Sequence, residues 1–323
     1  MTSLDLVCIG NAIVDVLAEA SHDALAAIGT SPGSMVLIDV GQMQRIEGGI
    51  TPARIMGGGS AANTAVVARL MGANVGYMGK VADDEAGRQY AADLRAEGLV
   101  YPSRPVAGAP VPTARCIILV TPDGQRTMHT YLGICTEFGP EDVDAETVRA
   151  AAVTYLEGYL FDKPQAKAAF VHAAELAHAA GRKVALTLSD AFCVDRHRAS
   201  FRQLVAGHID LLFANEAEIC ALYETAEIDE ALAAAARDVG IAAVTRSEKG
   251  AVVMIDGVRH DVPTGPVQVV DTTGAGDAFA AGFLAAMTRG LGLTECAALG
   301  NRAAGRVIGQ IGARPGKDFD LRA

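Results

Sequence analysis

Residues 271–283 read Asp271-Thr-Thr-Gly-Ala-Gly-Asp277-Ala-Phe-Ala-Ala-Gly-Phe283, a glycine turn that leads into an uncharged segment. This segment follows the apolar residues 267–270 and predicts a helix that ends near Met287. The turn leaves backbone N–H groups unobstructed at the helix N-terminus, where these groups and the helix dipole favour a bound anion. Asp277 lies in the first helical turn and is suited to take a proton from a hydroxyl beside that anion. The alternative is that Asp277 only caps the helix.

A second glycine cluster, Gly57-Gly-Gly-Ser-Ala-Ala-Asn63, opens another predicted helix over residues 60–71. Gly58 and Gly59 permit close approach of the backbone to a ligand, and Asn63 offers an amide from the first turns of the helix. The alternative is a flexible hinge before a core helix. The cluster is not a P-loop, because no Lys-Ser/Thr pair follows the glycines.

Outside these motifs, short apolar runs alternate with Ala-rich segments of helical length. Continuous apolar runs of this kind are typical of strands covered on both faces, so the alternation predicts a parallel sheet with right-handed crossovers. The predicted fold is α/β, a doubly wound and mostly parallel sheet flanked by helices. The apolar runs begin at Leu4 and also span 153–160, 184–189, 209–215 and 241–245; the helical segments span 60–71, 84–97, 164–180 and 229–238.

Two regions, residues 12–56 and 104–133, break this alternation. The second predicts a hairpin around Pro122-Asp-Gly124, and the first contains two further strand-like stretches. Antiparallel strands inserted in an α/β chain predict a small separate sheet that covers the ligand cleft as a lid. We therefore expect residues 1–323 to form one domain with this lid. Its exposed edge offers a route to a homodimer, and a monomer is the alternative.

Composition excludes several classes of partner. The 323 residues carry 27 Lys and Arg against 38 Asp and Glu, a formal net charge of −11, which argues against nucleic acid or an anionic membrane surface. No uncharged run reaches the length of a membrane span, and the first residues lack the pattern of a signal peptide. The six scattered cysteines predict buried reduced thiols in a cytoplasmic protein.

The two glycine motifs, in this order and about 210 residues apart, resemble the paired signatures of PfkB-type (ribokinase-like) carbohydrate and nucleoside kinases. The resemblance covers nearly the whole chain. It implies a transfer of phosphate from ATP, assisted by Mg²⁺, to a hydroxyl of a small-molecule substrate. In this scheme Asp277 is the general base, and the turn of Gly274, Ala275 and Gly276 stabilises the transferring phosphoryl group.

Further matches concern the nucleotide side. Asn215-Glu-Ala-Glu218 resembles the family's Asn-x-x-Glu element, which implies that Asn215 and Glu218 hold water on Mg²⁺; a helix N-cap with acidic first-turn residues is the alternative. Thr245-Arg-Ser-Glu-Lys-Gly250 resembles the nucleotide loop Thr-x-Gly-x-x-Gly, with Ser247 in place of the middle glycine. Asn301 falls where the family's adenine-side polar residue lies.

On the acceptor side, Gly10-Asn11-Ala-Ile-Val-Asp15 is closer in pattern to adenosine kinases than to ribokinases. The resemblance implies that Asp15 binds sugar hydroxyls, together with Asn11, Gly58, Gly59 and Asn63. Glu157 is a charged residue inside an apolar run and needs a reason to be there. Contact with the acceptor and a helix-capping or lid contact are its two explanations.

The family resemblance also implies a K⁺ ion held by backbone carbonyls of Asp271, Thr273 and the loop near Gly312. The expected acceptor is the primary, 5′-type hydroxyl of a ribonucleoside, adenosine first, with a sugar such as ribose or fructose as the alternative. A dinucleotide-binding oxidoreductase is a more distant hypothesis, because no Gly-x-Gly-x-x-Gly follows the first strand. A non-catalytic ligand sensor is another.

Overall fold

The computed structural model describes residues 3–316 and 319. An eight-stranded sheet forms its centre, with the order β13-β12-β11-β10-β9-β8-β1-β5. All neighbours in this sheet pair in parallel except β12 with β11 and β13 with β12, so the prediction of a mostly parallel sheet is confirmed. The strands are β1 (Leu4–Ile9), β5 (Val75–Met78), β8 (Ala151–Glu157), β9 (Lys183–Thr187), β10 (Leu211–Asn215), β11 (Ile241–Thr245), β12 (Ala251–Ile255) and β13 (Val258–Val262).

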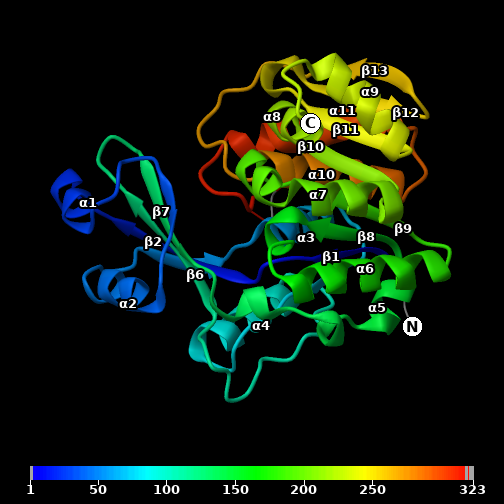
Figure 1. Cartoon of the computed structure of the whole chain (residues 1–323). Coiled ribbons are helices and arrows are strands. Elements are labelled where there is room, and N and C mark those ends of the chain that lie inside the picture. The colour runs from blue at the N-terminus through cyan, green and yellow to red at the C-terminus, as the bar shows by residue number, and fades with distance from the viewer. Residues whose placement is uncertain (1–2, 317–318, 320–323) are drawn as a thin grey trace.

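Helices cover both faces of this sheet, as expected for a doubly wound fold (Figure 1). One face packs against α3 (Ser60–Leu70), α4 (Glu85–Ala96), α10 (Ala275–Met287) and α11 (Leu293–Ile308). The other packs against α5 (Ala145–Ala150), α6 (Pro164–Ala179), α7 (Ala191–His208), α8 (Glu216–Tyr223) and α9 (Ile228–Asp238). Alternation along β10 explains how one strand serves both layers, since Phe213 packs with the first group and Leu212 with the second.

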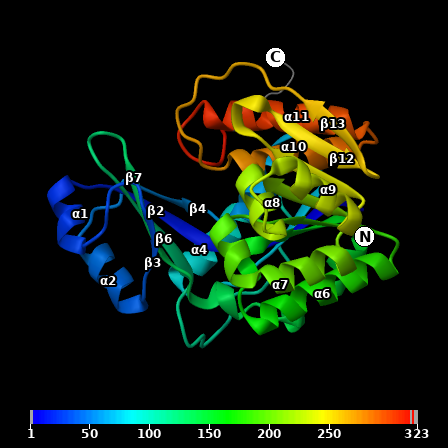
Figure 2. The same ribbon diagram turned by 45° about the horizontal axis from the view of Figure 1, so that its top comes forward.

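A second, five-stranded sheet stands beside this body (Figures 1 and 2). Its order is β3-β7-β6-β2-β4, from β3 (Met35–Leu37), β7 (Arg126–Tyr131), β6 (Ala114–Val120), β2 (Ile13–Glu19) and β4 (Arg54–Gly57). The expected hairpin is present as β6 and β7. The expected antiparallel pairing is present between β6 and β7 and between β2 and β4, but β2 pairs with β6, and β3 with β7, in parallel, so the expectation is wrong for those two pairs.

The sequence also missed two helices of this second sheet, α1 (His22–Ile28) and α2 (Val40–Gly48). They cover one face of the sheet, where Leu25 and Ile46 pack against Ile117 and Leu119. Period-two alternation sends Asp15 to the opposite face, together with its neighbours Cys116 and Thr130. One face of the sheet is thus a small hydrophobic core, and the other presents Asp15.

The positions of the cysteines agree with the prediction of buried thiols in all but one case. Five of the six cysteines are buried, Cys220 is partly exposed, and all six are free thiols. Within residues 3–316 and 319, no helix is both long enough and apolar enough to cross a bilayer.

Candidate active site

Asp277 joins the two glycine motifs. It lies in the first turn of α10, where the Ser60 hydroxyl donates a 2.6 Å hydrogen bond to Oδ1 and the Asn63 amide donates a 3.0 Å bond to Oδ2. Both partners come from the first turn of α3, more than 210 residues earlier in the chain. Burial raises the pKa of Asp277 to about 6, and the two hydrogen bonds oppose that rise. The carboxylate is therefore held in place as an acceptor of protons.

The glycine turn beside Asp277 has the backbone that its sequence predicts. Gly274 has φ +80° and is the N-cap of α10, which Ala275 opens. A Cβ on Gly274 would lie 2.6 Å from the Cβ of Ala313, so the C-terminal loop packs directly on the turn. A Cβ on Gly276 would meet nothing within 4 Å, so the helix N-terminus is open on that side.

Asp15 lies against the other glycine motif. A Cβ on Gly58 would be 2.4 Å from both Asp15 carboxylate oxygens, so only glycine allows this approach. Gly59, at φ +93°, packs in the same way on the carbonyl of Asn11. Burial raises the pKa of Asp15 to about 6, against the attraction of Arg314 and Arg126. The residues predicted for the acceptor therefore form one cluster.

Glu157 accepts three hydrogen bonds from residues next to this cluster. Its Oε1 accepts hydrogen bonds from the backbone and side-chain amides of Asn11, at 3.2 and 3.1 Å, and its Oε2 accepts one from the backbone of Ala61, at 2.7 Å. Glu157 is 1% exposed, and burial raises its pKa to about 7. Of its two explanations, the geometry provides a cap at the start of α3. A contact with the acceptor stays a prediction.

Asn215 and Glu218 form a capping box at the start of α8. The Asn215 side chain accepts a 2.9 Å hydrogen bond from the backbone of Glu218, and the Glu218 carboxylate accepts from the backbone and the side chain of Asn215. Glu218 is buried, and burial raises its pKa to about 7, with the charges of Asp190 and Asp277 adding to the rise. The three-residue spacing of Asn215 and Glu218 thus has a structural role of its own. A cation would also stabilise the buried charge of Glu218.

The loop after β11 keeps its expected backbone. Thr245 ends β11 beside Asn215 of β10. Ser247 has φ +51°, so the chain holds the left-handed conformation there without the middle glycine. Gly250, at φ +82°, packs on the carbonyl of Val262. Asn301 of α11 is buried and donates to that same carbonyl at 3.1 Å, so it supports this loop from behind.

The two loops expected around a K⁺ ion are adjacent. The Asp271 carboxylate accepts hydrogen bonds from the backbone of Thr273 at 3.0 Å and of Gly312 at 2.8 Å. It also forms an ion pair with Arg126 of β7, which links the five-stranded sheet to this loop. No cluster of three or more Asp, Glu, His or Cys side chains suited to a metal ion occurs in the part of the chain that the structure describes.

Comparison with known proteins decides the family. The model of the pfkB family carbohydrate kinases matches residues 53–319. The chain belongs to this family. Its fold matches the crystal structure of adenosine kinase from Sinorhizobium meliloti, with 49% identity, a TM-score of 0.89 and coverage of 99% of this chain and 97% of that one. A probable sugar kinase from Rhizobium etli CFN 42 matches with 46% identity, a TM-score of 0.90 and the same coverage.

A curated relative, the ATP-dependent ribose-1-phosphate kinase of Halopiger xanaduensis, is 31% identical over 86% of this chain and 88% of its own length. Membership of the PfkB family makes the chain a kinase that transfers a phosphoryl group to an alcohol, with ATP and a nucleoside or sugar as substrates. The oxidoreductase and sensor hypotheses are therefore wrong.

Sequence reasoning missed three polar residues of this PfkB kinase site: Ser60, Arg126 and Arg314. Ser60 stands inside the second glycine motif, which was the available signal. Arg126 follows the hairpin turn, and Arg314 follows Gly312 by two residues. Neither arginine lies in a motif, and only the folded chain brings them to the site.

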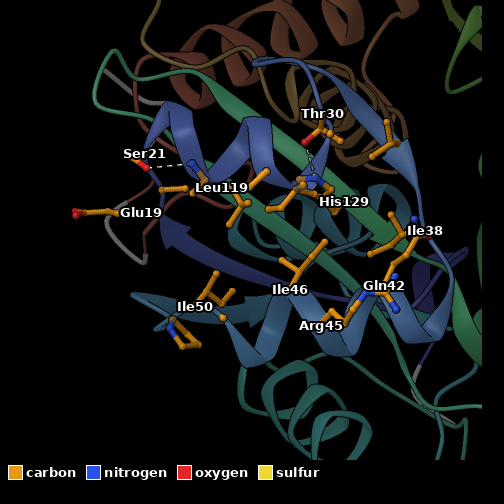
Figure 3. A pocket seen from close by; sticks show the side chains of 18 of the residues that line it. Glu19, Ser21, Thr30, Ile38, Gln42, Arg45, Ile46, Ile50, Leu119 and His129 are labelled. Carbon is orange, nitrogen blue, oxygen red and sulfur yellow. Dashed lines mark hydrogen bonds between the residues drawn. The ribbon is translucent and has the colours of Figure 1, made fainter.

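A groove of about 1260 Å³ lies elsewhere in this PfkB kinase, between α1 and α2 on the helix-covered face of the five-stranded sheet (Figure 3). Ile46, Ile50 and Leu119 line it, and His129 bonds to Thr30 at its wall. Asp15 faces the other side of the same sheet, so the groove is separate from the candidate active site.

Proposed function

We propose that the chain phosphorylates the 5′-hydroxyl of a ribonucleoside, with adenosine as the preferred acceptor. The observation that carries this proposal is the pair of carboxylates Asp15 and Asp277 at the two glycine motifs. In this proposal the whole chain acts as one domain, with residues 12–56 and 104–133 as the lid.

Asp277 would take the proton of the attacking hydroxyl. Ser60 and Asn63 hold its two oxygens, so a lone pair stays directed at the acceptor without reorganisation. The backbone of the turn Gly274, Ala275 and Gly276 would bind the transferring phosphoryl group at the positive end of α10, where the Ala275 N–H also donates to the Thr272 carbonyl at 3.2 Å. Neither role needs a basic side chain.

Asp15 would bind the ribose hydroxyls, as an acceptor of two hydrogen bonds. Asn11, Gly58, Gly59 and Asn63 surround the same space and would complete the sugar site. The backbone N–H of Gly58 donates to the carbonyl of Ile13 in β2 at 2.7 Å, so Asp15 and Gly58 would form one wall of this sugar site.

The apolar surroundings of Asp15 favour a nucleoside over a free sugar. Register places Leu17, Ile118 and Met128 in one row on the face of the lid that carries Asp15. Met35 and Leu37 continue this face from β3 and are 51% and 56% exposed. A purine base needs apolar walls of this kind, whereas a free pentose offers mainly hydroxyls. The adenosine kinase of Sinorhizobium meliloti supports the same choice.

On the donor side, Thr245, Ser247, Gly250 and Asn301 would line the ATP site beside β11. Asn215 and Glu218 fit a Mg²⁺ ion held through water, because both Glu218 oxygens already serve the capping box and retain one lone pair each. When bound, Mg²⁺ supplies charge neutralisation for the ATP phosphates. Backbone carbonyls of Asp271, Thr273 and Gly312 would hold K⁺ between two loops that the structure already joins.

Metal dependence is the first prediction. Chelation of Mg²⁺ should abolish ADP release, and replacing K⁺ by a large organic cation should reduce the rate because the two loops lose a bridging charge. Rates at matched ionic strength measure both effects. Full activity without Mg²⁺ would refute the Mg²⁺ assignment, and an unchanged rate without K⁺ would refute the cation site.

The experiment that tests the acceptor is competition. A mixture of adenosine, inosine, guanosine, ribose, fructose and ribose 1-phosphate is incubated with the enzyme and ATP, and the products are separated by mass. We expect the highest kcat/KM for a nucleoside and a 5′-monophosphate as product. A sugar kinase is the second candidate, favoured by the relative from Rhizobium etli. A free sugar that wins by about tenfold or more, a difference of ~1.4 kcal/mol in transition-state binding, would establish it.

A further inference from the structure

Arg314 enters the active site from the loop that follows α11. Its Nε donates a 2.9 Å hydrogen bond to Oδ1 of Asn63, and its Nη2 donates a 3.0 Å bond to the carbonyl of Gly58. The guanidinium also lies close to Gly57, where a Cβ would be 2.7 Å from Nη1. Arg314 thus forms hydrogen bonds to Gly58 and Asn63 and packs against Gly57, all in the second glycine motif.

The bond to Asn63 fixes which end of that amide faces Asp277. A guanidinium has only donors, so it can bond only to the carbonyl end of Asn63. The NH₂ end is then left for Asp277, to which it donates at 3.0 Å. If Asn63 were turned over, its carbonyl would face Asp277, and the contact would be favourable only with a proton on the carboxyl group.

We propose that Arg314 is a positioning residue for phosphoryl transfer, which holds Asp277 as a proton acceptor by fixing the orientation of Asn63. The inference rests on the proposed role of Asp277 as the base. It gives the C-terminal loop a part in the chemistry, although Arg314 need not touch either substrate.

Electrostatics act in the same direction. Arg314 lowers the pKa of Asp277 and of Asp15, against the larger effect of burial. The other titratable groups that interact with Asp277 in the described part of the chain carry negative or no charge: Cys8 of β1, Tyr155 and Glu157 of β8, Tyr159, and Glu218 of α8. Removing Arg314 therefore takes away the positive charge that opposes the raised pKa of Asp277.

Arg314 also fixes the peptide between Gly58 and Gly59. The Gly58 carbonyl accepts from both Arg314 and the hydroxyl of Tyr90, the latter at 3.1 Å. Because a peptide is planar and trans, fixing its carbonyl also fixes the direction of the Gly59 N–H. Loss of Arg314 should therefore loosen the acceptor site as well.

The test is the pH dependence of kcat at saturating ATP and acceptor, so that titration of acceptor-binding groups such as Asp15 appears mainly in KM. We expect Arg314→Met and Arg314→Gln to move the acid limb of the profile about one pH unit upward. The loss of kcat should then be several-fold larger at pH 5.5 than at pH 9. Arg314→Lys retains the charge and should leave the limb within about 0.3 units of the original, with a modest loss of kcat.

Arg88→Met is the matched control, since Arg88 is an exposed arginine that pairs with Asp83. The acid limb of the pH profile should not move in this variant. An unmoved limb in the folded Met and Gln variants, with a loss that is equal at all pH values, would overturn the inference. If Arg314→Met fails to fold, the acid limbs of Arg314→Lys and Arg314→Gln are compared instead. Limbs at the same pH in these two variants would then overturn the inference. Normal turnover of Asp277→Asn would instead refute the proposed base, so the two failures are distinguishable.

Discussion

Asp15 and Asp277 are alike in burial and differ in their partners. Ser60 and Asn63 donate hydrogen bonds to both oxygens of Asp277, whereas Asp15 packs against Gly58 and is attracted by Arg314 and Arg126. A carboxylate without fixed donors is expected to gain them from a ligand. This difference suits Asp277 to chemistry and Asp15 to binding.

Asp15→Ala should therefore weaken binding of the acceptor far more than binding of ATP. The carboxylate would supply two charge-assisted hydrogen bonds to the acceptor, so we expect an increase in acceptor KM of about 10- to 100-fold. Titration calorimetry with each ligand measures the loss of affinity for the acceptor and for ATP. Asp83→Ala, at an exposed position, is the control. Equal losses for acceptor and ATP would be inconsistent with a sugar-binding Asp15.

Residues of the two glycine motifs could be predicted from the sequence because turn and helix start are encoded locally. Asp277, Gly274 and Gly59 are such cases, and the positive φ angles of both glycines bear this out. Arg314 could not be predicted, since its contact with Asn63 joins positions 251 residues apart. The sequence marks Glu157 as a charge inside an apolar run, but its three donors come from Asn11 and Ala61, which are far from it in the chain.

At the scale of elements, the start of α3 carries the proposed acceptor site. Gly59 adopts φ +93° and ψ +131° at the N-cap, and no side chain caps the helix there. The Glu157 carboxylate takes the place of a local cap by accepting from the backbone of Ala61. The position of α3 therefore depends on β8.

Gly59→Ala should destabilise the protein and impair acceptor binding. Its Cβ would lie 2.2 Å from the Asn11 carbonyl, at a φ that L-residues rarely adopt, and we expect a loss of about 2–4 kcal/mol in the free energy of unfolding. Urea denaturation measures it. Gly48→Ala in α2 is the control, because its Cβ would meet nothing within 4 Å and should be neutral or slightly stabilising. Equal stability of the two variants would contradict the close packing at Gly59.

The long elements of the body could be predicted because each has a clear apolar pattern and its own start and stop signals. Predicted helices at 60–71 and 164–180 lie within one or two residues of α3 and α6. The lid was less predictable. Its strands pair across long stretches of chain, and α1 and α2 are short helices that depend on packing against β6.

At the scale of the whole molecule, four acidic side chains of the candidate site have raised pKa values. Glu157 and Glu218 are buried, and Asp15 and Asp277 are partly exposed. Burial raises the pKa of Asp15 and Asp277 to about 6 and of Glu157 and Glu218 to about 7. In the unfolded chain these groups lose their protons near pH 4. The folded state therefore binds more protons between about pH 4 and 7, and its stability falls as pH rises through this range.

The ligand-free protein should consequently be more stable at pH 5.5 than at pH 7.5. We expect a difference of at least about 1 kcal/mol in the free energy of unfolding, measured by urea denaturation. Glu157→Gln should reduce the slope, because it removes one of the four titrations. A free energy of unfolding that is equal or higher at pH 7.5 would show that the pKa values of these carboxyl groups are not raised as described.

The central claim is that Asp277 removes the proton of an acceptor hydroxyl, and turnover by Asp277→Asn tests it most directly. The substitution keeps the size of the side chain and removes its basicity. We expect a fall in kcat of at least ~10²-fold with adenosine, the usual scale for a lost general base, while the melting temperature and the affinity for ATP stay close to those of the original protein. Near-normal turnover in the folded variant would contradict the account.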